Sequence, residues 1–206
     1  MGPDGGAVMP GAAFLRGERV TLRTVEEEDL EFVRDNIDDP RVRRPLTSAS
    51  PTNMETTREH FEEHVSGDDT VELAVCVDDG ARRFEDAESD GPRDGDVLGT
   101  VSLFDIEDGH AEIGYWLTPD VHGDGVMTEA ARLLVRYAFE ELRLHRVRGR
   151  ALATNEPSKR VLRNCGMQEE GVMREAEHVN GEYVDMVYFG VLREECENQN
   201  WRVDAQ

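Results

Sequence analysis

The fold is decided by residues 114–130, GYWLTPDVHGDGVMTEA. The first four complete an apolar strand over Glu112–Leu117, two glycines follow in a turn, and an amphipathic helix begins after Gly125. The first amides of a helix have no acceptor inside it and carry the positive end of the helix dipole, so they attract anions. The segment therefore predicts a phosphate-binding turn. Gly123 and Gly125 alone are equally typical of a structural turn, and neither the P-loop nor the dinucleotide fingerprint is complete.

A second polar cluster opens another helix, in NEPSKRVLRNCGM at residues 155–167. Asn155 is a typical N-cap, Pro157 fits the first helical turn, and Gly166 stands at the position that usually closes a helix. Asn155 and Ser158 have two interpretations. Either both only cap the helix, or Asn155 also holds the amides of a ligand and Ser158 offers a hydroxyl proton. The cap alone is the simpler interpretation.

Patterning along the rest of the chain predicts a mixture of strands and helices. Period-two alternation indicates strands, and apolar residues at near-helical spacing indicate helices. The expected strands span 19–24, 71–77, 97–104, 112–117, 146–153, 168–178 and 183–191, and the expected helices span 26–36, 53–65, 126–142 and 157–164. Asn180-Gly181, between the last two strands, is a strong hairpin signal. The order of the elements predicts a mixed fold class, with an antiparallel meander followed by alternating helix and strand.

The chain is expected to hold one domain with two tails. Residues 1–15 are predicted to be a flexible tail, because they lack the basic and apolar regions of a signal peptide. The domain spans 16–195 and contains an acidic loop, 78–96, to which we assign no function. Residues 196–206 form a C-terminal tail, in which Trp201 is either a partner contact or loosely packed.

The charge of the chain excludes one class of partner. Among 206 residues, 45 are acidic and 23 basic, for a net charge of −22. Nucleic-acid binding needs a basic stripe that this composition does not supply. The acidity has two interpretations, a pocket for cationic substrates or a surface adapted to concentrated salt. Because the acids are spread over every segment, we favour the salt-adapted surface.

Cysteine usage and hydropathy indicate a cytoplasmic protein. Cys76, Cys165 and Cys196 form no C-x-x-C pair and no even framework, which is typical of reduced thiols, and none carries a nucleophile signature. No apolar run approaches the ~18 residues that span a membrane. A homodimer is compatible with the sequence.

In this order and spacing, the motifs resemble the GNAT N-acetyltransferase superfamily, and most of all its RimJ/RimL-like branch of ribosomal-protein-alanine N-acetyltransferases. The matching segments are EIGYWL at 112–117, the glycine turn with MTEA at 127–130, LRLHRV at 142–147, and residues 155–167. The resemblance runs from about Glu18 to about Glu195. It implies an α+β (mixed α/β) acyl-CoA N-acyltransferase fold, with a central, mostly antiparallel mixed sheet flanked by helices.

The resemblance also implies the donor and its site. Family members use acetyl-CoA and no metal, and transfer the acetyl group directly to a primary amine. The pantetheine runs beside the strand that ends at Leu117, and Asn155 and Ser158 border it. The pyrophosphate lies on the amides of the turn, which here belong to His122, Gly123, Gly125, Val126, Met127 and Thr128.

Amide formation needs a base, an oxyanion donor and an acid. An α-amine with a pKa near 8 must lose a proton, the tetrahedral oxyanion needs a donor, and the thiolate leaves better when protonated. We expect the donor to be the main-chain N–H of Leu117 and the acid to be Ser158, which the resemblance places at the thiol. The base is expected to be Glu177, which matches the carboxylate proposed for this role in the RimL-like branch and could act through one water. Glu112 is the second candidate and has an equally good structural interpretation.

Other charges qualify the donor site. Asp120 stands where the superfamily usually has Gln or Arg, although main-chain amides supply most phosphate contacts. Lys159 and either Arg160 or Arg163 could meet the CoA phosphates, or form an exposed helix face. A chain at −22 repels CoA at low ionic strength, whereas ~1 M salt shortens the Debye length to ~3 Å. We therefore expect CoA binding to hold or tighten as salt rises.

Three functions follow from these observations. The leading one is acetyl transfer from acetyl-CoA to a protein N-terminal α-amine. The second is acetylation of a small-molecule amine, such as an antibiotic or a polyamine. The third, from a different class, is a non-catalytic acyl-CoA-binding regulatory module, which the presence of both Ser158 and Glu177 disfavours.

Overall fold

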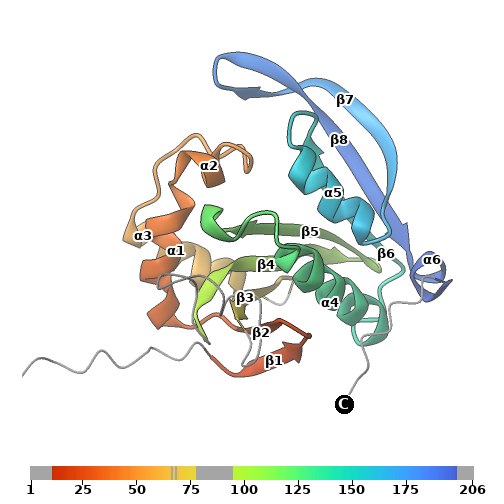
Figure 1. Ribbon diagram of the computed structural model, residues 1–206, viewed down its shortest axis with the longest axis horizontal. Helices are drawn as coiled ribbons and strands as arrows, with labels where there is room; N and C mark the ends of the chain where they lie inside the picture. Colours follow the sequence, from red (N-terminus) through yellow and green to blue (C-terminus); the bar gives the residue numbers. More distant parts are fainter. Residues whose placement is uncertain (1–10, 66, 68, 78–94, 199–206) are drawn as a thin grey trace, which may run out of the picture.

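A single mixed sheet organises the chain, in a computed structural model that describes residues 11–65, 67, 69–77 and 95–198 (Figure 1). Its spatial order is β1-β2-β3-β4-β5-β6-β8-β7, and every neighbouring pair is antiparallel except β5 and β6. The strands are β1 (Ala13–Arg16), β2 (Val20–Thr24), β3 (Val71–Val77), β4 (Val97–Glu107), β5 (His110–Leu117), β6 (Arg146–Leu152), β7 (Gln168–Val179) and β8 (Glu182–Leu192). The expected α+β class with a mostly antiparallel mixed sheet is confirmed.

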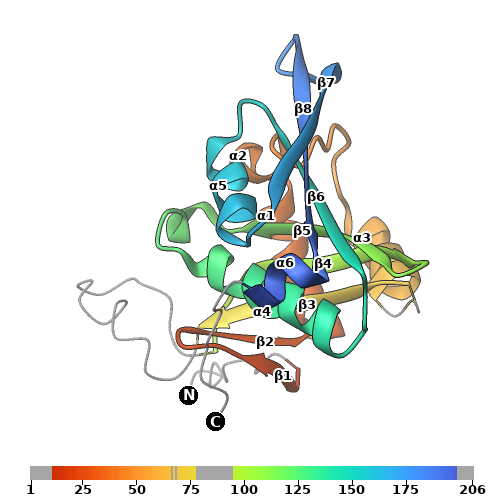
Figure 2. The same cartoon turned by 90° about the vertical axis from the view of Figure 1, so that its right-hand side faces the viewer.

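Helices cover the two faces of this sheet unequally (Figures 1 and 2). On one face lie η1 (Glu27–Asp29), α1 (Leu30–Ile37), α2 (Pro40–Arg43), α3 (Met54–His60) and the π-helical turn η2 (Phe61–Val65). On the other lie α4 (Val126–Glu140) and α5 (Glu156–Asn164), while η3 (Pro119–Val121) precedes α4 and α6 (Arg193–Asn198) follows β8. The β7–β8 hairpin extends beyond the helices at one end of the sheet.

Strand β3 shows how one sequence serves both faces. Leu73, Val75 and Val77 join the main core with α4, whereas Ala74 and Cys76 belong to a second cluster against Phe61 and Val65 of η2. This alternation follows from the two-residue period of a strand. Burial raises the pKa of the Cys76 thiol to about 12, so it behaves as an apolar core residue.

Strands β5 and β6 separate soon after they meet. Their parallel pairing covers three residue pairs, His110 with Arg146, Ala111 with Val147 and Glu112 with Arg148. β5 continues to Leu117, paired with β4 along this length. The edge of β5 from Ile113 to Leu117 therefore faces an opened gap in the sheet, which sets the position of the site described below.

Local signals explain how the last elements begin and end. Asn180 and Gly181 have φ of 56° and 89°, as a two-residue type I′ hairpin requires, and Val179 pairs with Glu182. Gly166 (φ 75°) closes α5, where its amide bonds to the carbonyl of Arg163 and that of Met167 bonds to Leu162. This is the Schellman arrangement, so the expected C′ role of Gly166 is confirmed.

Several boundaries differ from the sequence-based expectations. The tail predicted over residues 1–15 is corrected, because Ala13–Arg16 pairs with β2 as an edge strand that had no distinct pattern of its own. The stretch between the expected helices 26–36 and 53–65 contains α2, where Asp39 caps the helix by accepting from the Arg41 amide and Pro40 occupies the first turn. The predictions for 1–10, for 78–94 of the acidic loop and for 199–206 with Trp201 fall outside the described residues.

Candidate active site

A cavity of about 590 Å³ lies at the gap between β5 and β6. This size is ordinary for a small-molecule site. It collects the residues expected in the site with one exception, Glu177. The predicted residues that line it are Glu112, Leu117, His122, Gly123, Gly125, Val126, Met127, Thr128, Asn155 and Ser158.

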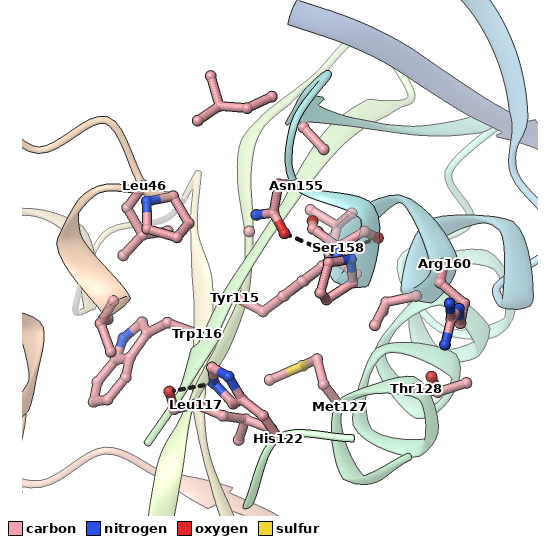
Figure 3. Close-up of a pocket in the computed structure, with 18 of the residues that line it drawn as sticks. Leu46, Tyr115, Trp116, Leu117, His122, Met127, Thr128, Asn155, Ser158 and Arg160 are labelled. Atoms are coloured by element: carbon pink, nitrogen blue, oxygen red, sulfur yellow. Dashed lines mark hydrogen bonds between the residues drawn. The ribbon is translucent and has the colours of Figure 1, made fainter. Parts of the chain in front are cut away.

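The cavity connects the two faces of the sheet. Side chains alternate along β5, so Glu112 and Trp116 lie on the face of α1 and α2, whereas Tyr115 and Leu117 lie on the face of α4 and α5. All four line the cavity. Figure 3 shows Trp116 on the same side as Leu46, which follows α2 in the chain, and Tyr115 extending toward Ser158 of α5. A ligand in this gap can therefore meet a second ligand that enters from the opposite face.

The turn before α4 presents unpaired amides to the cavity. Gly123 and Gly125 have φ of 95° and 80°, which glycine adopts without strain, and α4 begins directly after Gly125. The first helical bond of α4 runs from the Glu129 amide to the Gly125 carbonyl. Within the described part of the chain, no group accepts from the amides of Gly123, Gly125, Val126, Met127 or Thr128. Such a set of donors at a helix N-terminus fits a pyrophosphate.

His122 contributes differently from the expectation. Its amide donates to the Pro119 carbonyl at 3.2 Å and is not free for a phosphate. Its ring Nε2 lies 3.0 Å from the Leu117 carbonyl, and because a carbonyl only accepts, Nε2 carries the proton in this bond (Figure 3). The expected amide role of His122 is therefore corrected to a side-chain contact that fixes the turn against the end of β5.

The main-chain N–H of Leu117 faces the gap. The Thr118 amide donates to Leu98 of the β4 side at 2.7 Å, and successive residues of a strand direct their amides to opposite edges. The Leu117 amide therefore points away from β4, into the part of the sheet where β6 has departed. The amide that was expected to be the oxyanion donor is thus directed into the gap.

The side chain of Arg19 holds the phosphate turn in place. Arg19, at the start of β2, donates from Nη1 to the Asp124 carbonyl at 2.8 Å and from Nε to Glu129 Oε2 at 3.0 Å. Glu129 Oε1 in turn accepts the amides of Glu18 and Arg19. Sequence reasoning did not identify this network, because the two ends lie 110 residues apart and an isolated arginine gives no signal.

Ser158 is joined to Tyr115 across the gap. The two hydroxyl oxygens lie 2.9 Å apart, and the Tyr115 hydroxyl is also 3.1 Å from the Ser158 carbonyl, to which it donates. Burial raises the pKa of Tyr115, so the phenol stays protonated. Ser158 lines the cavity, as the sequence predicted, and Tyr115 is a lining residue that the sequence analysis did not single out. In the sequence, an aromatic residue in an apolar strand indicates only core packing.

The start of α5 supplies further polar groups. Asn155 caps the helix by accepting from the Ser158 amide at 3.2 Å, and its side-chain NH₂ faces the same cavity. Arg160 lines the cavity near Thr128 (Figure 3). Lys159 instead binds Glu156 and the Ala153 carbonyl, and Arg163 binds Glu156 and Glu169. Of the three expected cations, Arg160 is thus the one that lines the cavity.

Glu112 carries a fully occupied carboxylate. Its Oε2 lies 3.0 Å from Arg148 Nε and its Oε1 lies 2.9 Å from Arg150 Nε, while Arg148 also binds Asp105 at 3.0 Å. The Glu112 side chain is 8% exposed, and those of the two arginines are about half exposed. Two guanidinium groups on the two oxygens favour the structural interpretation of Glu112. The R-x-R pattern of β6 was the available signal, since alternate residues share a face.

Glu177 lies apart from the cavity. It is half-buried on β7, opposite Val184 and close to the hairpin turn, and it follows an irregularity between Met173 and Glu177. It is absent from the described lining of the cavity. Its neighbour His178 pairs with Tyr183. Because adjacent residues of a strand point to opposite faces, the side chains of Glu177 and His178 leave β7 on opposite faces.

The opening on the side of α2 is mostly apolar. Leu46, Trp116, Phe104 and Met186 line it, and Trp116 stacks on Phe32 of α1 with ring centroids 6.0 Å apart. Its ionisable lining residues are Arg41, Glu112 and Arg150. No group of three metal-ligating side chains occurs among the described residues, and no described helix has the length and hydropathy to cross a bilayer.

Comparison with known proteins accounts for this arrangement. Residues 19–168 match the acetyltransferase (GNAT) domain. The chain is 33% identical over 190 residues to "Putative ribosomal N-acetyltransferase YdaF" of Bacillus subtilis (strain 168), covering 88% of this chain and 96% of that protein. It is 24% identical over 186 residues to spermidine N(1)-acetyltransferase of Vibrio cholerae, covering 88% of this chain and 98% of that protein.

A solved structure has the same fold. The crystal structure of spermidine N-acetyltransferase from Vibrio cholerae in complex with CoA and spermine superimposes with a TM-score of 0.74, at 21% identity. The match covers 87% of this chain and 98% of that one. The overall fold is therefore shared over nearly the whole length of both chains.

Proposed function

The chain belongs to the GNAT acetyltransferase family, and from this premise we propose that it transfers the acetyl group of acetyl-CoA directly to a primary amine, in particular a protein N-terminal α-amine. One observation carries the proposal. The cavity joins a helix N-terminus with five unpaired amides to an apolar opening on the other face of the sheet. An anionic donor and an amine acceptor can therefore meet at the edge of β5.

The residues present fit the donor. The amides of Gly123, Gly125, Val126, Met127 and Thr128 would hold the pyrophosphate, since helix N-terminal amides favour anions. Arg160 would add a positive charge beside them. The open edge of β5 and the side-chain amide of Asn155 would bind the pantetheine amides. Acetyl-CoA supplies an activated thioester at this point.

We propose the following chemistry at the gap. The amine nitrogen attacks the thioester carbonyl carbon, the Leu117 amide stabilises the oxyanion, and the C–S bond then breaks. Ser158 donates its hydroxyl proton to the departing thiolate. Before the transfer this proton points to the Tyr115 oxygen, 2.9 Å away, because the phenol proton is donated to the Ser158 carbonyl, and this contact positions the serine hydroxyl. The attacking nitrogen loses its proton to a base, and this proton returns through solvent to the Ser158 alkoxide, so the protons of the two products and of the enzyme balance.

The base is proposed to be Glu177 acting through water, with Glu112 as the second candidate. Glu177 lies on the β7–β8 hairpin and does not line the cavity, so a direct contact with the amine is not part of the proposal. Glu112 lines the cavity, but two arginines occupy its oxygens. Comparison of Glu177→Gln with Glu112→Gln separates them, because loss of the base lowers kcat while CoA binding persists.

The acceptor has a second candidate, a small-molecule amine. Each acceptor class is supported by the name of one relative, the ribosomal class by the Bacillus protein and the small-amine class by the spermidine enzyme of Vibrio. The position of the motifs in 112–117 and 155–167 supports the RimJ/RimL-like branch, and with it a cytoplasmic protein. The net charge of −22 supports a salt-adapted source.

The first experiment is calorimetric titration of acetyl-CoA in molar KCl, followed by a panel of N-terminal peptides and small amines. We expect binding, and turnover with a peptide. Binding without turnover on any amine would favour a non-catalytic acyl-CoA-binding module, and absence of binding would exclude the proposed function. Ser158→Ala should lower kcat by roughly 10²-fold or more, the usual contribution of a general acid.

A further inference from the structure

The charges at the acceptor opening point to the class of amine that this enzyme accepts. Glu112 is the one carboxylate among the described residues that line the cavity. It is buried, and Arg148 and Arg150 occupy its two oxygens at 3.0 and 2.9 Å. The strongly acidic character of the chain therefore does not extend to the lining of its site.

A polyamine needs the opposite arrangement. Spermidine carries several ammonium groups at neutral pH, and each one that leaves water needs a carboxylate or another acceptor. Here the cationic side chains of Arg41, which is paired with Asp39, and of Arg150 line the opening, and Leu46, Trp116 and Met186 make most of the remaining lining apolar. A second ammonium group would be desolvated beside guanidinium groups, and like charges at short range repel.

We propose that Arg150 determines acceptor specificity: by neutralising Glu112 it excludes polycations and leaves a site for a single amine on an uncharged chain, such as a peptide N-terminus. This inference rests on the proposed acetyl transfer. Arg150 sits on β6 opposite Tyr188 of β8, where its side chain shares a face with Glu112 and with Leu152 of the opening. Arg148 holds Glu112 from the other side and also binds Asp105, so it keeps the carboxylate in place when Arg150 is replaced.

The test compares kcat/KM for spermidine with kcat/KM for a peptide that has uncharged side chains. Wild-type enzyme is expected to prefer the peptide by at least tenfold. Arg150→Gln frees one oxygen of Glu112 and should shift the ratio toward spermidine by about tenfold, whereas Arg150→Lys keeps the charge and should keep the wild-type ratio. The double variant Arg150→Gln/Glu112→Gln should lose the shift, because the exposed carboxylate is its cause.

Arg136→Gln is the matched control. It removes the same charge from α4, where Arg136 Nε lies 3.9 Å from Glu140 Oε2. Arg136 does not line the cavity, so this variant should leave the ratio unchanged. Calorimetric binding of acetyl-CoA verifies that each variant is folded. A wild-type enzyme that prefers spermidine, or an Arg150→Gln ratio equal to that of Arg136→Gln, would overturn the inference while acetyl transfer stands. Absence of turnover with every amine would overturn the proposed function as well.

Discussion

At the scale of single residues, the site depends on side chains that hold other groups in position. Tyr115 is the clearest case, because its phenol spans the gap between β5 and α5 and contacts Ser158 twice. A buried hydroxyl that stays protonated can orient a neighbouring hydroxyl without taking up its proton. The orientation of Ser158, and not only its presence, should therefore affect the departure of the thiolate.

Replacing Tyr115 by Phe should lower kcat by about five- to tenfold, the effect of one hydrogen bond of about 1 kcal/mol. Steady-state kinetics with saturating acetyl-CoA would measure this change. Ser158→Ala and the double variant Ser158→Ala/Tyr115→Phe should show nearly equal rates, because Tyr115 acts through Ser158. Additive effects of the two substitutions would contradict the orienting role.

His60 offers a residue-scale prediction about pH. Its Nε2 lies 3.2 Å from Glu72 of β3, and this hydrogen bond raises the pKa of His60 above its ordinary value of 6.5. The pair therefore stabilises the fold fully below pH 6.5, and this contribution is lost as the pH rises through the raised pKa. Because the His60 side chain is about half exposed, we expect an effect below about 1 kcal/mol.

An NMR titration of the His60 ring should give a pKa above 6.5 in the wild-type chain. Glu72→Gln should lower that pKa, because the acceptor of the ring proton loses its charge. The stacked neighbour His64, whose ring centroid lies 4.8 Å away, provides an internal reference in the same spectrum. A His60 pKa that does not change in Glu72→Gln would exclude the ion pair in solution.

At the scale of elements, the position of the phosphate turn depends on a contact with the first hairpin. Arg19 and Glu129 connect the β1–β2 turn to the first turn of α4 through four hydrogen bonds. Gly17 permits this approach, since a Cβ there would lie 2.4 Å from Glu129 Oε1. A glycine-rich turn has little stiffness of its own, so this contact holds the amides in a binding conformation before the ligand arrives.

Arg19→Ala should weaken acetyl-CoA binding about tenfold, which corresponds to about 1.4 kcal/mol, and should raise KM for acetyl-CoA more than it lowers kcat. Arg16→Ala removes the same charge from exposed β1 and serves as the control. Arg19→Lys should recover part of the affinity, because an ammonium group can reach one of the two acceptors but not both. Equal affinities of Arg19→Ala and Arg16→Ala would show that the turn holds its shape without the contact.

Elements with strong local signals were the predictable ones. The helix after Gly125, the cap at Asn155, the close at Gly166 and the Asn180-Gly181 hairpin all formed where their patterns indicated. The short β1 was missed because an edge strand of four residues carries no periodicity that could identify it. The expected end of β4 fell short, although the Asp108-Gly109 turn (φ 47° and 80°) was a readable signal.

In the site too, the features that local sequence signals determine were the predictable ones. Main-chain donors followed from the turn and helix that carry them, so the amides at 123–128 could be anticipated. Side-chain partnerships across the sheet could not, because Arg19 with Glu129, Tyr115 with Ser158, and Arg150 with Glu112 meet only after distant strands pair. Family resemblance supplied the lining residue Ser158, and also Glu177, which the lining does not include.

At the scale of the whole molecule, a net charge of −22 belongs to a chain whose proposed donor is an anion. The global field acts over the Debye length, ~10 Å at ~0.1 M salt and ~3 Å at ~1 M, whereas the amides of the turn act at contact distance. Added salt therefore screens the repulsion between the acidic surface and the anionic ligand before it weakens the attraction between the turn amides and the ligand. The local donors decide affinity only once the field of the surface is screened.

Calorimetry at increasing KCl should give an acetyl-CoA Kd that holds or falls between ~0.1 and ~1 M salt. S-acetylpantetheine, which lacks the phosphate groups, is the matched control ligand and should show little dependence on salt. A Kd for acetyl-CoA that rises steeply over this range would mean that exposed cations such as Arg160, and not the helix N-terminus, hold the phosphates.

The gap between β5 and β6 has a consequence for the lifetime of the protein. Three residue pairs join β5 to β6 within the sheet, so a bound ligand that fills the gap adds contacts between these two strands where their pairing has ended. A ligand that binds only the folded chain, at about 100 times its Kd, adds about 2.7 kcal/mol to the free energy of unfolding. The concentration of the donor would then affect resistance to proteolysis as well as turnover. At a low concentration of acetyl-CoA, the enzyme would be degraded faster.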